Sequence, residues 1–472
     1  MLKPKTMIKR NNIKFIAILV LPLVLQSCFV AKNYERPDVE TQKLYRTDQL
    51  PQDSVSMAQV SWKDIFTDAQ LQSHIEKGLT NNLDIRIALQ SIISAEAYLK
   101  QGKAGYFPTL SATASATRTK NSENSQFGSI FSEAIEQYQL SGTLSWEADV
   151  WGKIRSNKRS ANANYLQSVA AHQAVKTQLV ASIADLYYQL LALDRQKLVA
   201  EETLEARKSS LETTMALKDA GQVTEVAVKQ TEAQVHTTEI ILIDLENNIK
   251  LLENSFSLLL GEAPHSIART TIEDQEINTD LKTGVPALLL ANRPDVIQAE
   301  YALVNAFELT NVARSSMYPS LTLTAQGGFQ SLELDNFIDA SSLFSSLVGS
   351  LTQPLFNQRK LRTQLEIARA QQEQALLNYK KSLLTAGQEV SNALYNYEAE
   401  TKKLSAREKE LDSYVLAEDY SEELLNNGLA NYLEVLTARQ NALNSELNLI
   451  DSKYGQLSAT VELYRALGGG WQ

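Results

Sequence analysis

Residues 106–110 read Tyr-Phe-Pro-Thr-Leu, and residues 317–321 read Met-Tyr-Pro-Ser-Leu. Each proline is followed by a stretch in which small or apolar residues alternate with serine, threonine or glutamine. Such alternation puts apolar side chains on one face of a β-strand and polar side chains on the other. The sequence therefore predicts two equivalent strands, one in each half of the chain.

The match between the two halves extends well beyond these strands. Pro108 and Pro319 lie 211 positions apart, and Asp84 and Asp295 share that spacing. Further along, Gly221 pairs with Gly428, Gly261 with Gly468 and Arg155 with Arg362, all at a spacing of 207. An ordered series on two spacings indicates an internal duplication with one small change of length. We expect a first repeat at 70–262, a linker at 263–285, a second repeat at 286–469 and a tail at 470–472.

Each repeat ends in a long region without proline, at residues 109–263 and 355–472. Proline is the strongest helix breaker, and good helix formers dominate both regions. A helix over 153–220 would be about 100 Å long at roughly 1.5 Å per residue. Gly221 and Gly428 suit the left-handed position that ends such a helix. The sequence predicts helical hairpins at 153–262 and 357–467.

Two further segments show strand alternation, so each repeat holds two strands. The expected strands span 104–120, 135–151, 315–331 and 343–356. A sheet with one apolar face either packs on a protein core or faces lipid. The flanking helices are too long to fold back as a cover, which favours lipid. Since even small barrels need about eight strands, other subunits must complete the sheet. The result is an α+β fold built from a duplicated helix–strand–helix unit.

Aromatic residues lie near the expected strand ends. Trp146, Trp151 and Phe356 hold these positions, where aromatic side chains mark a membrane interface. Basic residues follow at once, and they suit either lipid headgroups or ordinary solvation of a helix start: Lys153, Arg155, Arg359 and Arg362.

The N-terminus has the layout of a secretory signal peptide at residues 1–27. A basic start is followed by an apolar run from Phe15 to Leu25, which is about half the ~20 residues of a membrane-spanning helix. Leu25-Gln26-Ser27-Cys28 resembles the lipobox of bacterial lipoproteins, so we expect a lipid on Cys28. Phe29, rather than aspartate, follows the cysteine, which by resemblance to enterobacterial lipoprotein sorting favours the outer membrane. The segment 28–69 is expected to be extended.

Charge and residue content exclude several functions. Without residues 1–27 the chain has 40 basic and 55 acidic residues, which disfavours nucleic-acid binding. The four histidines lack the spacing of metal ligands, and no phosphate loop or nucleophile motif is present. We therefore expect neither an enzyme nor a cofactor.

Further motifs carry a family resemblance. Residues 145–155 read Ser-Trp-Glu-Ala-Asp-Val-Trp-Gly-Lys-Ile-Arg, and residues 352–356 read Thr-Gln-Pro-Leu-Phe. With the duplication and the strand-opening prolines, these resemble the TolC-like outer-membrane efflux proteins, and the lipobox indicates their lipoprotein branch. The resemblance implies a homotrimer whose twelve strands form one β-barrel and whose twelve helices form a hollow periplasmic cylinder. It also implies a passive conduit that serves an inner-membrane pump of the RND type through a periplasmic adaptor.

The resemblance extends to the hairpin tips, here Gly221 and Gly428, where family members narrow and meet the adaptor. Glu434 matches the constriction acid, and three copies would form one anionic ring. Thr437 stands at the position of a second acid in TolC, and Ala227 at the acid position of the first repeat. Leu425 and Ala430 depart from the tyrosine and arginine that lock the TolC tip.

A soluble periplasmic adaptor or scaffold lipoprotein is the alternative interpretation. Such proteins also have long helical hairpins, but they lack this duplication and the four alternating strands.

Overall fold

The computed structural model describes residues 30–39, 44, 46, 56–126, 133–275 and 289–472. The expected signal peptide and Cys28 lie outside the described residues. The described chain divides into two compact units, the first from residues within 1–37, 93–167 and 299–378, and the second from residues within 38–92, 168–298 and 379–472.

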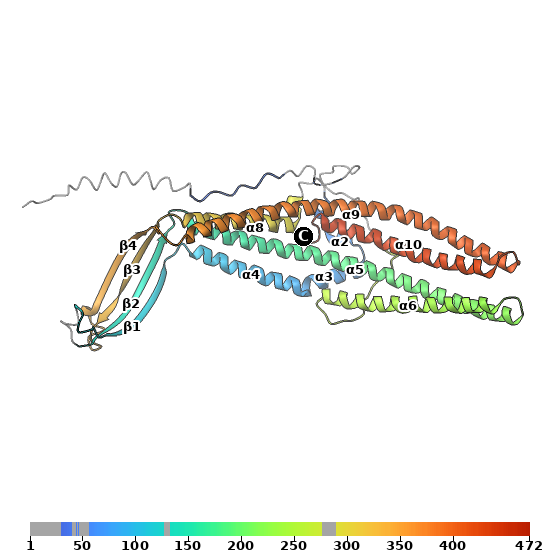
Figure 1. Ribbon diagram of the computed structural model, residues 1–472, viewed down its shortest axis with the longest axis horizontal. Coiled ribbons are helices and arrows are strands. Elements are labelled where there is room, and N and C mark those ends of the chain that lie inside the picture. Colours follow the sequence, from blue (N-terminus) through green and yellow to red (C-terminus); the bar gives the residue numbers. More distant parts are fainter. Residues whose placement is uncertain (1–29, 40–43, 45, 47–55, 127–132, 276–288) are drawn as a thin grey trace, which may run out of the picture. The chain divides into compact units, whose positions relative to one another are not determined.

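The first repeat begins with helices and ends with a long hairpin (Figure 1). The short helices η2 and α2 precede it, at Met57–Gln59 and Trp62–Ile65. Its own elements are α3 (Ala69–Asn81), α4 (Leu83–Ala104), β1 (Thr109–Thr119), β2 (Ile135–Ala148), α5 (Lys153–Asp219) and α6 (Glu225–Leu259).

The second repeat has the same order of elements. They are α7 (Leu289–Asn292), α8 (Pro294–Ser315), β3 (Ser320–Ser331), η4 (Ala340–Ser342), β4 (Leu343–Thr352), α9 (Lys360–Asn426) and α10 (Tyr432–Ala466). The helices α5 and α9 both have 67 residues, α6 and α10 both have 35, and α4 and α8 both have 22. Equal lengths at equivalent positions confirm the duplication predicted from the sequence.

The strands are shorter than expected at the ends nearest the helices. α4 continues to Ala104 and β1 begins only at Thr109, because Pro108 lacks the N–H group that a strand ladder needs. β3 likewise begins after Pro319 rather than at residue 315, and β4 ends at Thr352, before Pro354, rather than at residue 356.

Two other expectations are wrong, because side chains cap helices close to these segments. β2 ends at Ala148 rather than at residue 151, since the Asp149 carboxylate accepts hydrogen bonds from the backbone N–H groups that open α5. The segment 28–69 is not extended throughout, because Ser56 and Ser61 each cap a short helix with a side-chain oxygen.

The four strands form one antiparallel sheet in the order β1-β2-β3-β4, and it lies in the first unit. In the second unit, the buried residues of α5 follow helical spacing: Ile183, Tyr187 and Leu190 are fully buried. The equivalents of Ile183 and Tyr187 in α9, Val390 and Leu394, are also buried, and Tyr397, the equivalent of Leu190, is half-buried. The second unit therefore has a core formed by the same helix face in each repeat.

Among the described residues, none of the helices combines the length and hydropathy needed to cross a bilayer.

Candidate functional site

The sheet has one apolar and one polar face across all four strands. The strand register puts the apolar residues of neighbouring strands next to one another. Leu144 pairs with both Leu110 and Ala325, and Ala325 pairs with Leu347. The side chains that share this apolar face are Leu110, Ala112, Ala114, Ala116, Leu140, Leu144, Trp146, Ala148, Leu321, Leu323, Ala325, Phe329, Leu343, Leu347 and Leu351.

This apolar face is exposed within the described chain. Leu110 is 77% exposed, Leu347 is 72% exposed and Leu351 is 70% exposed. In the first unit the helices lead away from the strand ends, and none lies over the sheet (Figure 1). Exposing apolar surface to water costs about 25 cal/mol per Å², so a face of this extent needs an apolar environment.

The opposite face has mainly hydroxyl and carboxamide side chains, and its apolar members are Ile135, Phe344 and Val348. Ser141 is almost fully buried, and its hydroxyl accepts hydrogen bonds from Gln139 at 3.2 Å and from Gln326 at 3.1 Å. Thr143 on β2 lies between Ser111 on β1 and Gln326 on β3. This face therefore suits water.

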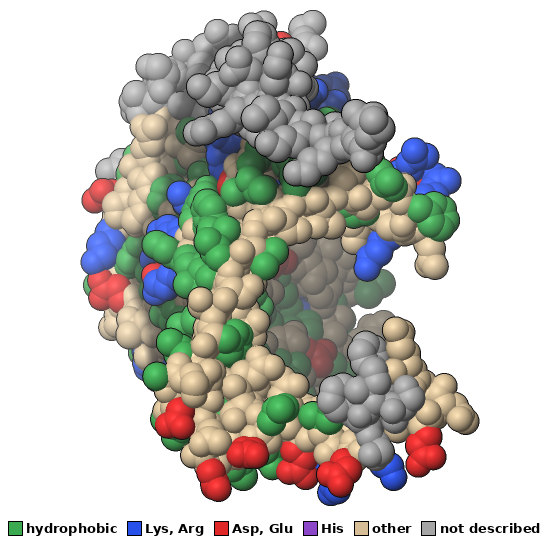
Figure 2. All heavy atoms as spheres, turned by 90° about the vertical axis from the view of Figure 1, so that its left-hand side faces the viewer, with side chains coloured by type: hydrophobic (Ala, Val, Ile, Leu, Met, Phe, Trp, Pro, Cys, Tyr) green, Lys and Arg blue, Asp and Glu red, His purple; other side chains and the backbone are tan. Residues whose placement is uncertain are grey.

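The segments that connect paired strands are acidic. Red side chains gather along the lower edge of the view onto the end of the molecule that has the sheet (Figure 2). Exposed carboxylates in these segments are Glu123, Glu133, Glu333, Asp335 and Asp339.

The three aromatic residues expected at a membrane interface lie at the helix-proximal strand ends. The Trp146 indole N–H donates to the Tyr106 carbonyl at 3.0 Å. The Trp151 indole N–H donates to the Pro319 carbonyl at 2.7 Å, and its ring lies 5.0 Å from that of Tyr318. Phe356 is 88% exposed. The two tryptophans thus tie each strand-opening segment to a neighbouring strand end, while Phe356 faces outward.

At the hairpin tips, Gly221 and Gly428 end α5 and α9 in the left-handed conformation, with φ of 75° and 69°. At the first tip, Gly221 N donates to Lys218 O and Gln222 N donates to Leu217 O. The second tip repeats both bonds at positions 207 residues later. Both tips are therefore Schellman turns, in which glycine avoids a steric cost.

Glu434 is exposed in the first turn of α10, three residues after the N-cap Asn431. Glu434 N donates to Asn431 Oδ1 at 3.1 Å, and Asn431 Nδ2 donates to Glu434 Oε1 at 2.9 Å. In the first repeat, the N-cap Thr224 makes no such bond and Ala227 replaces the acid. The second tip alone thus combines a side-chain cap with a carboxylate. The spacing Asn-x-x-Glu could have revealed this cap in the sequence.

A hydroxyl cluster joins the two hairpins just behind the second tip. The Tyr432 hydroxyl lies 3.0 Å from Thr214 Oγ1 on α5 and 2.7 Å from Thr231 Oγ1 on α6. Both threonines are almost fully buried. Sequence reasoning missed this cluster, since no periodic pattern marks a contact between residues 201 positions or more apart.

A buried arginine forms a second connection between the hairpins. Arg207 on α5 donates to the Gln234 carbonyl and to Thr238 Oγ1 on α6, and to Gln440 Oε1 on α10. Burial lowers the pKa of Arg207, and the nearby Arg439 lowers it further. On α10, Arg439 is paired with Glu418 at 3.3 Å and with Glu422 at 3.2 Å. The hairpins therefore hold each other through polar bonds as well as apolar packing.

The segment that follows Cys28 in the sequence is bound along α8 in the first unit. The Lys32 backbone N–H donates to Asn311 Oδ1, and Asn311 Nδ2 donates back to the Lys32 carbonyl. Arg314 donates to the Val30 carbonyl, and Arg36 forms two bonds of 2.6 Å to the Glu300 carboxylate. We call residues 30–37 the strap. It runs antiparallel to α8, with Val30 at the end nearest β3.

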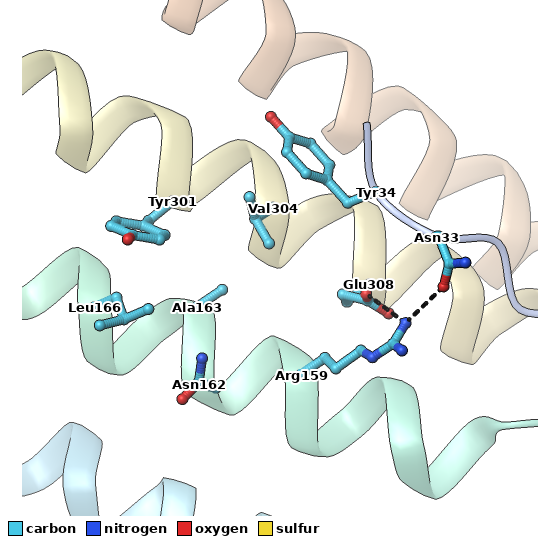
Figure 3. Close-up of a pocket in the computed structure, with 9 residues that line it drawn as sticks. All are labelled: Asn33, Tyr34, Arg159, Asn162, Ala163, Leu166, Tyr301, Val304 and Glu308. Atoms are coloured by element: carbon cyan, nitrogen blue, oxygen red, sulfur yellow. Dashed lines mark hydrogen bonds and ion pairs between the residues drawn. The ribbon is translucent and has the colours of Figure 1, made fainter. Parts of the chain in front are cut away.

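A cavity of about 330 Å³ lies beside the strap (Figure 3). Asn33 and Tyr34 of the strap line it, together with residues of α5 and α8. The buried Glu308 carboxylate lies 3.5 Å from Arg159, which also donates to Asn33 Oδ1 at 3.4 Å. The Asn311 side chain donates to Glu308 as well. Arg159 therefore links the strap to the buried Glu308 carboxylate at the edge of this cavity.

In the described part of the chain, no group of three or more His, Cys, Asp or Glu residues is arranged to hold a metal ion.

The family profile for "Outer membrane efflux protein" matches the chain twice, at residues 74–262 and 285–469. The chain belongs to this family of outer-membrane efflux channels, which are transport proteins and not enzymes.

Two curated relatives match over nearly their whole length. The chain is 31% identical to the solvent efflux pump outer membrane protein SrpC of Pseudomonas putida over 457 residues, which is 95% of this chain and 97% of the relative. It is 26% identical to the cation efflux system protein CusC of Escherichia coli strain K12 over 453 residues, again 95% and 97% of the two chains.

Solved structures agree with this assignment. The outer-membrane channel OprN superposes with a TM-score of 0.85 at 25% identity, covering 93% of this chain and 99% of that chain. A crystal structure of CusC superposes with a TM-score of 0.83 at 26% identity, with the same coverage. The α+β fold predicted from the sequence is confirmed, and the alternative of a soluble adaptor is set aside.

Proposed function

We propose that three copies of this chain form one efflux conduit, anchored by a lipid on Cys28 and closed at its periplasmic end by Glu434. The main support for this proposal comes from the sheet. Its apolar face is uncovered, and its outer strands β1 and β4 each pair on one side only within the described chain. An exposed sheet edge is a template for pairing with another chain. Joining β4 of one copy to β1 of the next closes a twelve-stranded barrel and covers both edges.

The strap supports the anchor. Arg314 and Asn311 hold the strap at the end of α8, and a Cβ atom on Gly152 would lie 3.0 Å from the Ala31 Cβ atom. Cys28 is two residues before Val30, a reach of about 7 Å. A lipid on Cys28 would therefore enter the bilayer near the strand ends, at the level of Trp151.

The hairpin tips support a partner at the periplasmic end. Gly221 and Gly428 end helices that are each about 100 Å long at roughly 1.5 Å per residue. This length suits a passage across the periplasm to an adaptor and an inner-membrane pump of the RND type. The cargo is a small molecule, such as a drug, another toxic compound or a metal ion, and the pump selects it.

The proposal is tested with Cys28→Ala, expressed with its signal peptide intact. If the strands cross the bilayer, the variant stays in the membrane after a carbonate wash and is extracted in detergent as a trimer. Reconstituted in a planar bilayer, both the variant and the wild type conduct ions. Release of a water-soluble monomer would overturn the proposal.

A further inference from the structure

The polar face of the sheet is almost free of charge. Threonine, serine and glutamine occupy most of it, as in the row of Thr143 and Gln326. Within the four described strands, Glu147 is the only ionisable side chain on this face. It lies beside Thr322 of β3, which in turn lies beside Ser350 of β4.

Lys153 neutralises this single charge. Its ammonium Nζ lies 2.9 Å from Glu147 Oε1 and 3.1 Å from Oε2, so it bonds to both carboxylate oxygens. Lys153 is the first residue of α5. The Asp149 carboxylate, two residues after Glu147, is engaged by the N–H groups of Ile154 and Arg155. Glu147 therefore depends on Lys153 for its counter-charge.

The pair is accessible from open space. Glu147 and Lys153 border a cavity of about 220 Å³ that Thr352 and Ser320 also line. Both side chains keep about a third of their surface exposed, at 33% and 38%. Ions in this space can therefore approach the pair directly.

The second repeat lacks this acid. Position 147 corresponds to Pro354 at the spacing of 207, while Lys153 corresponds to Lys360. A trimer would thus place three Glu147 carboxylates at the junction of strands and helices. Left unpaired, they would form an anionic ring that favours cations.

We propose that Lys153 is a specificity-determining residue: by neutralising Glu147, it keeps the strand-lined section of the passage uncharged, so that this section does not sort cargo by charge. This inference rests on the proposed function, because it takes the polar face as the lumen. Amphiphilic organic molecules of either charge, or of none, would then pass the section equally.

The test is the reversal potential of single channels under a KCl gradient. Lys153→Met exposes the carboxylate and shifts selectivity toward K⁺. Glu147→Gln exposes the ammonium and shifts it toward Cl⁻. The double variant returns to the wild-type value. If Lys153→Met fails to insert into the bilayer, Glu147→Gln alone tests the proposal.

Two further variants serve as controls, so that an unchanged reversal potential in the first variants can be interpreted. Gln326→Glu places a new charge on the same face and shifts selectivity toward K⁺. Glu136→Gln is the matched control, since Glu136 is also on β2 and is paired with Arg118 at 3.6 Å, but it lies on the opposite face. It leaves the reversal potential unchanged.

The outcomes separate the two proposals. If Gln326→Glu shifts the reversal potential while Glu147→Gln and Lys153→Met do not, the proposed role of Lys153 is wrong, but the proposed channel function is not contradicted. A double variant whose reversal potential differs from the wild-type value also contradicts the proposal that Lys153 neutralises Glu147. If Gln326→Glu has no effect, the polar face is not the lumen, and the proposed arrangement of the sheet fails with it.

Discussion

The Asn431 side chain caps the N-terminus of α10 and also binds the Glu434 side chain: its Oδ1 accepts from the Glu434 backbone N–H at 3.1 Å, and its Nδ2 donates to the Glu434 carboxylate at 2.9 Å. Glu434 therefore has a structural role that is independent of any pore. Removing it with alanine would change the charge and the helix end together, so its role in the gate needs a variant that separates them.

Glu434→Gln provides that separation. Glutamine serves in a capping box as glutamate does, so the helix end is kept while the charge is lost. We expect weaker block of single-channel current by divalent cations, with an unchanged melting temperature. Asn431→Ala is the complementary control: it loses about 1 kcal/mol of stability but keeps the block. Full block in Glu434→Gln would remove Glu434 from the gate.

Tyr432→Phe tests the hydroxyl cluster that joins the hairpins. The variant keeps the ring and loses the hydroxyl that lies between Thr214 and Thr231. Each threonine also donates to a carbonyl of its own helix, so neither is left without a bond. We expect a loss of about 1 kcal/mol in the free energy of unfolding, measured by denaturant titration.

The matched control for Tyr432→Phe is Tyr420→Phe, because the Tyr420 ring is 60% exposed on α9. Surface substitutions of this kind usually change stability by less than about 0.5 kcal/mol. Equal effects of the two variants would show that the cluster contributes nothing specific.

Gly221→Ala and Gly261→Ala form a pair that separates backbone strain from steric clash. The two glycines have nearly equal φ angles, 75° and 72°. A Cβ atom at Gly221 would meet no atom within 4 Å, but at Gly261 it would lie 2.6 Å from the Asn81 carbonyl oxygen. Both variants carry the left-handed cost of about 1 kcal/mol or more. Gly261→Ala should lose about 1–3 kcal/mol beyond that.

Thermal unfolding of the two alanine variants measures this difference. The second repeat offers an independent check, because Gly428 is as open as Gly221, while a Cβ atom at Gly468 would lie 2.5 Å from the Asn292 carbonyl oxygen. The same ranking is expected there. Equal melting temperatures within each pair would contradict the steric argument.

The sequence predicts those features of the fold that are periodic. Alternation identified the strand faces, and composition with the two glycines identified the hairpins, because these signals are local. Strand ends were wrong by up to five residues, since the expected first strand included residues 104–108, which belong to the end of α4 and to the turn that leads to β1.

Contacts between distant residues could not be predicted. Lys32 and Asn311 are 279 positions apart, and nothing in either segment encodes their pairing. Tyr432 is a similar case, because no sequence feature of a tyrosine at a helix start predicts which residues it contacts. Glu434 was found by resemblance, whereas its bond to Asn431 was missed although the Asn-x-x-Glu spacing is visible in the sequence. Trp146 and Trp151 were expected only as interface residues, and their bonds to backbone carbonyls add a structural role.

Asp68 links the inter-repeat linker to the core of the second unit. Its carboxylate accepts hydrogen bonds from the Tyr187 hydroxyl at 2.9 Å and from Gln275 at 2.8 Å, and also from Thr270. Burial alone would raise the pKa of Asp68, but the bonds from Thr270, Gln275 and the Leu71 N–H group outweigh it and hold the pKa below its usual value. The charged form is therefore the one that stabilises the fold.

A depressed pKa in the folded state fixes the direction of the pH dependence. The stabilisation is fully present above the unfolded pKa of about 4 and is lost as the pH falls through the folded value. Asp68→Asn should lower stability at pH 7, and its deficit relative to wild type should shrink below about pH 4. Asp64→Asn, an exposed carboxylate on α2, is the control and should change little at either pH. Melting temperatures from pH 3 to 7 measure both curves, and an Asp68→Asn deficit that stays constant over this range would show that the carboxylate charge is not what stabilises the linker.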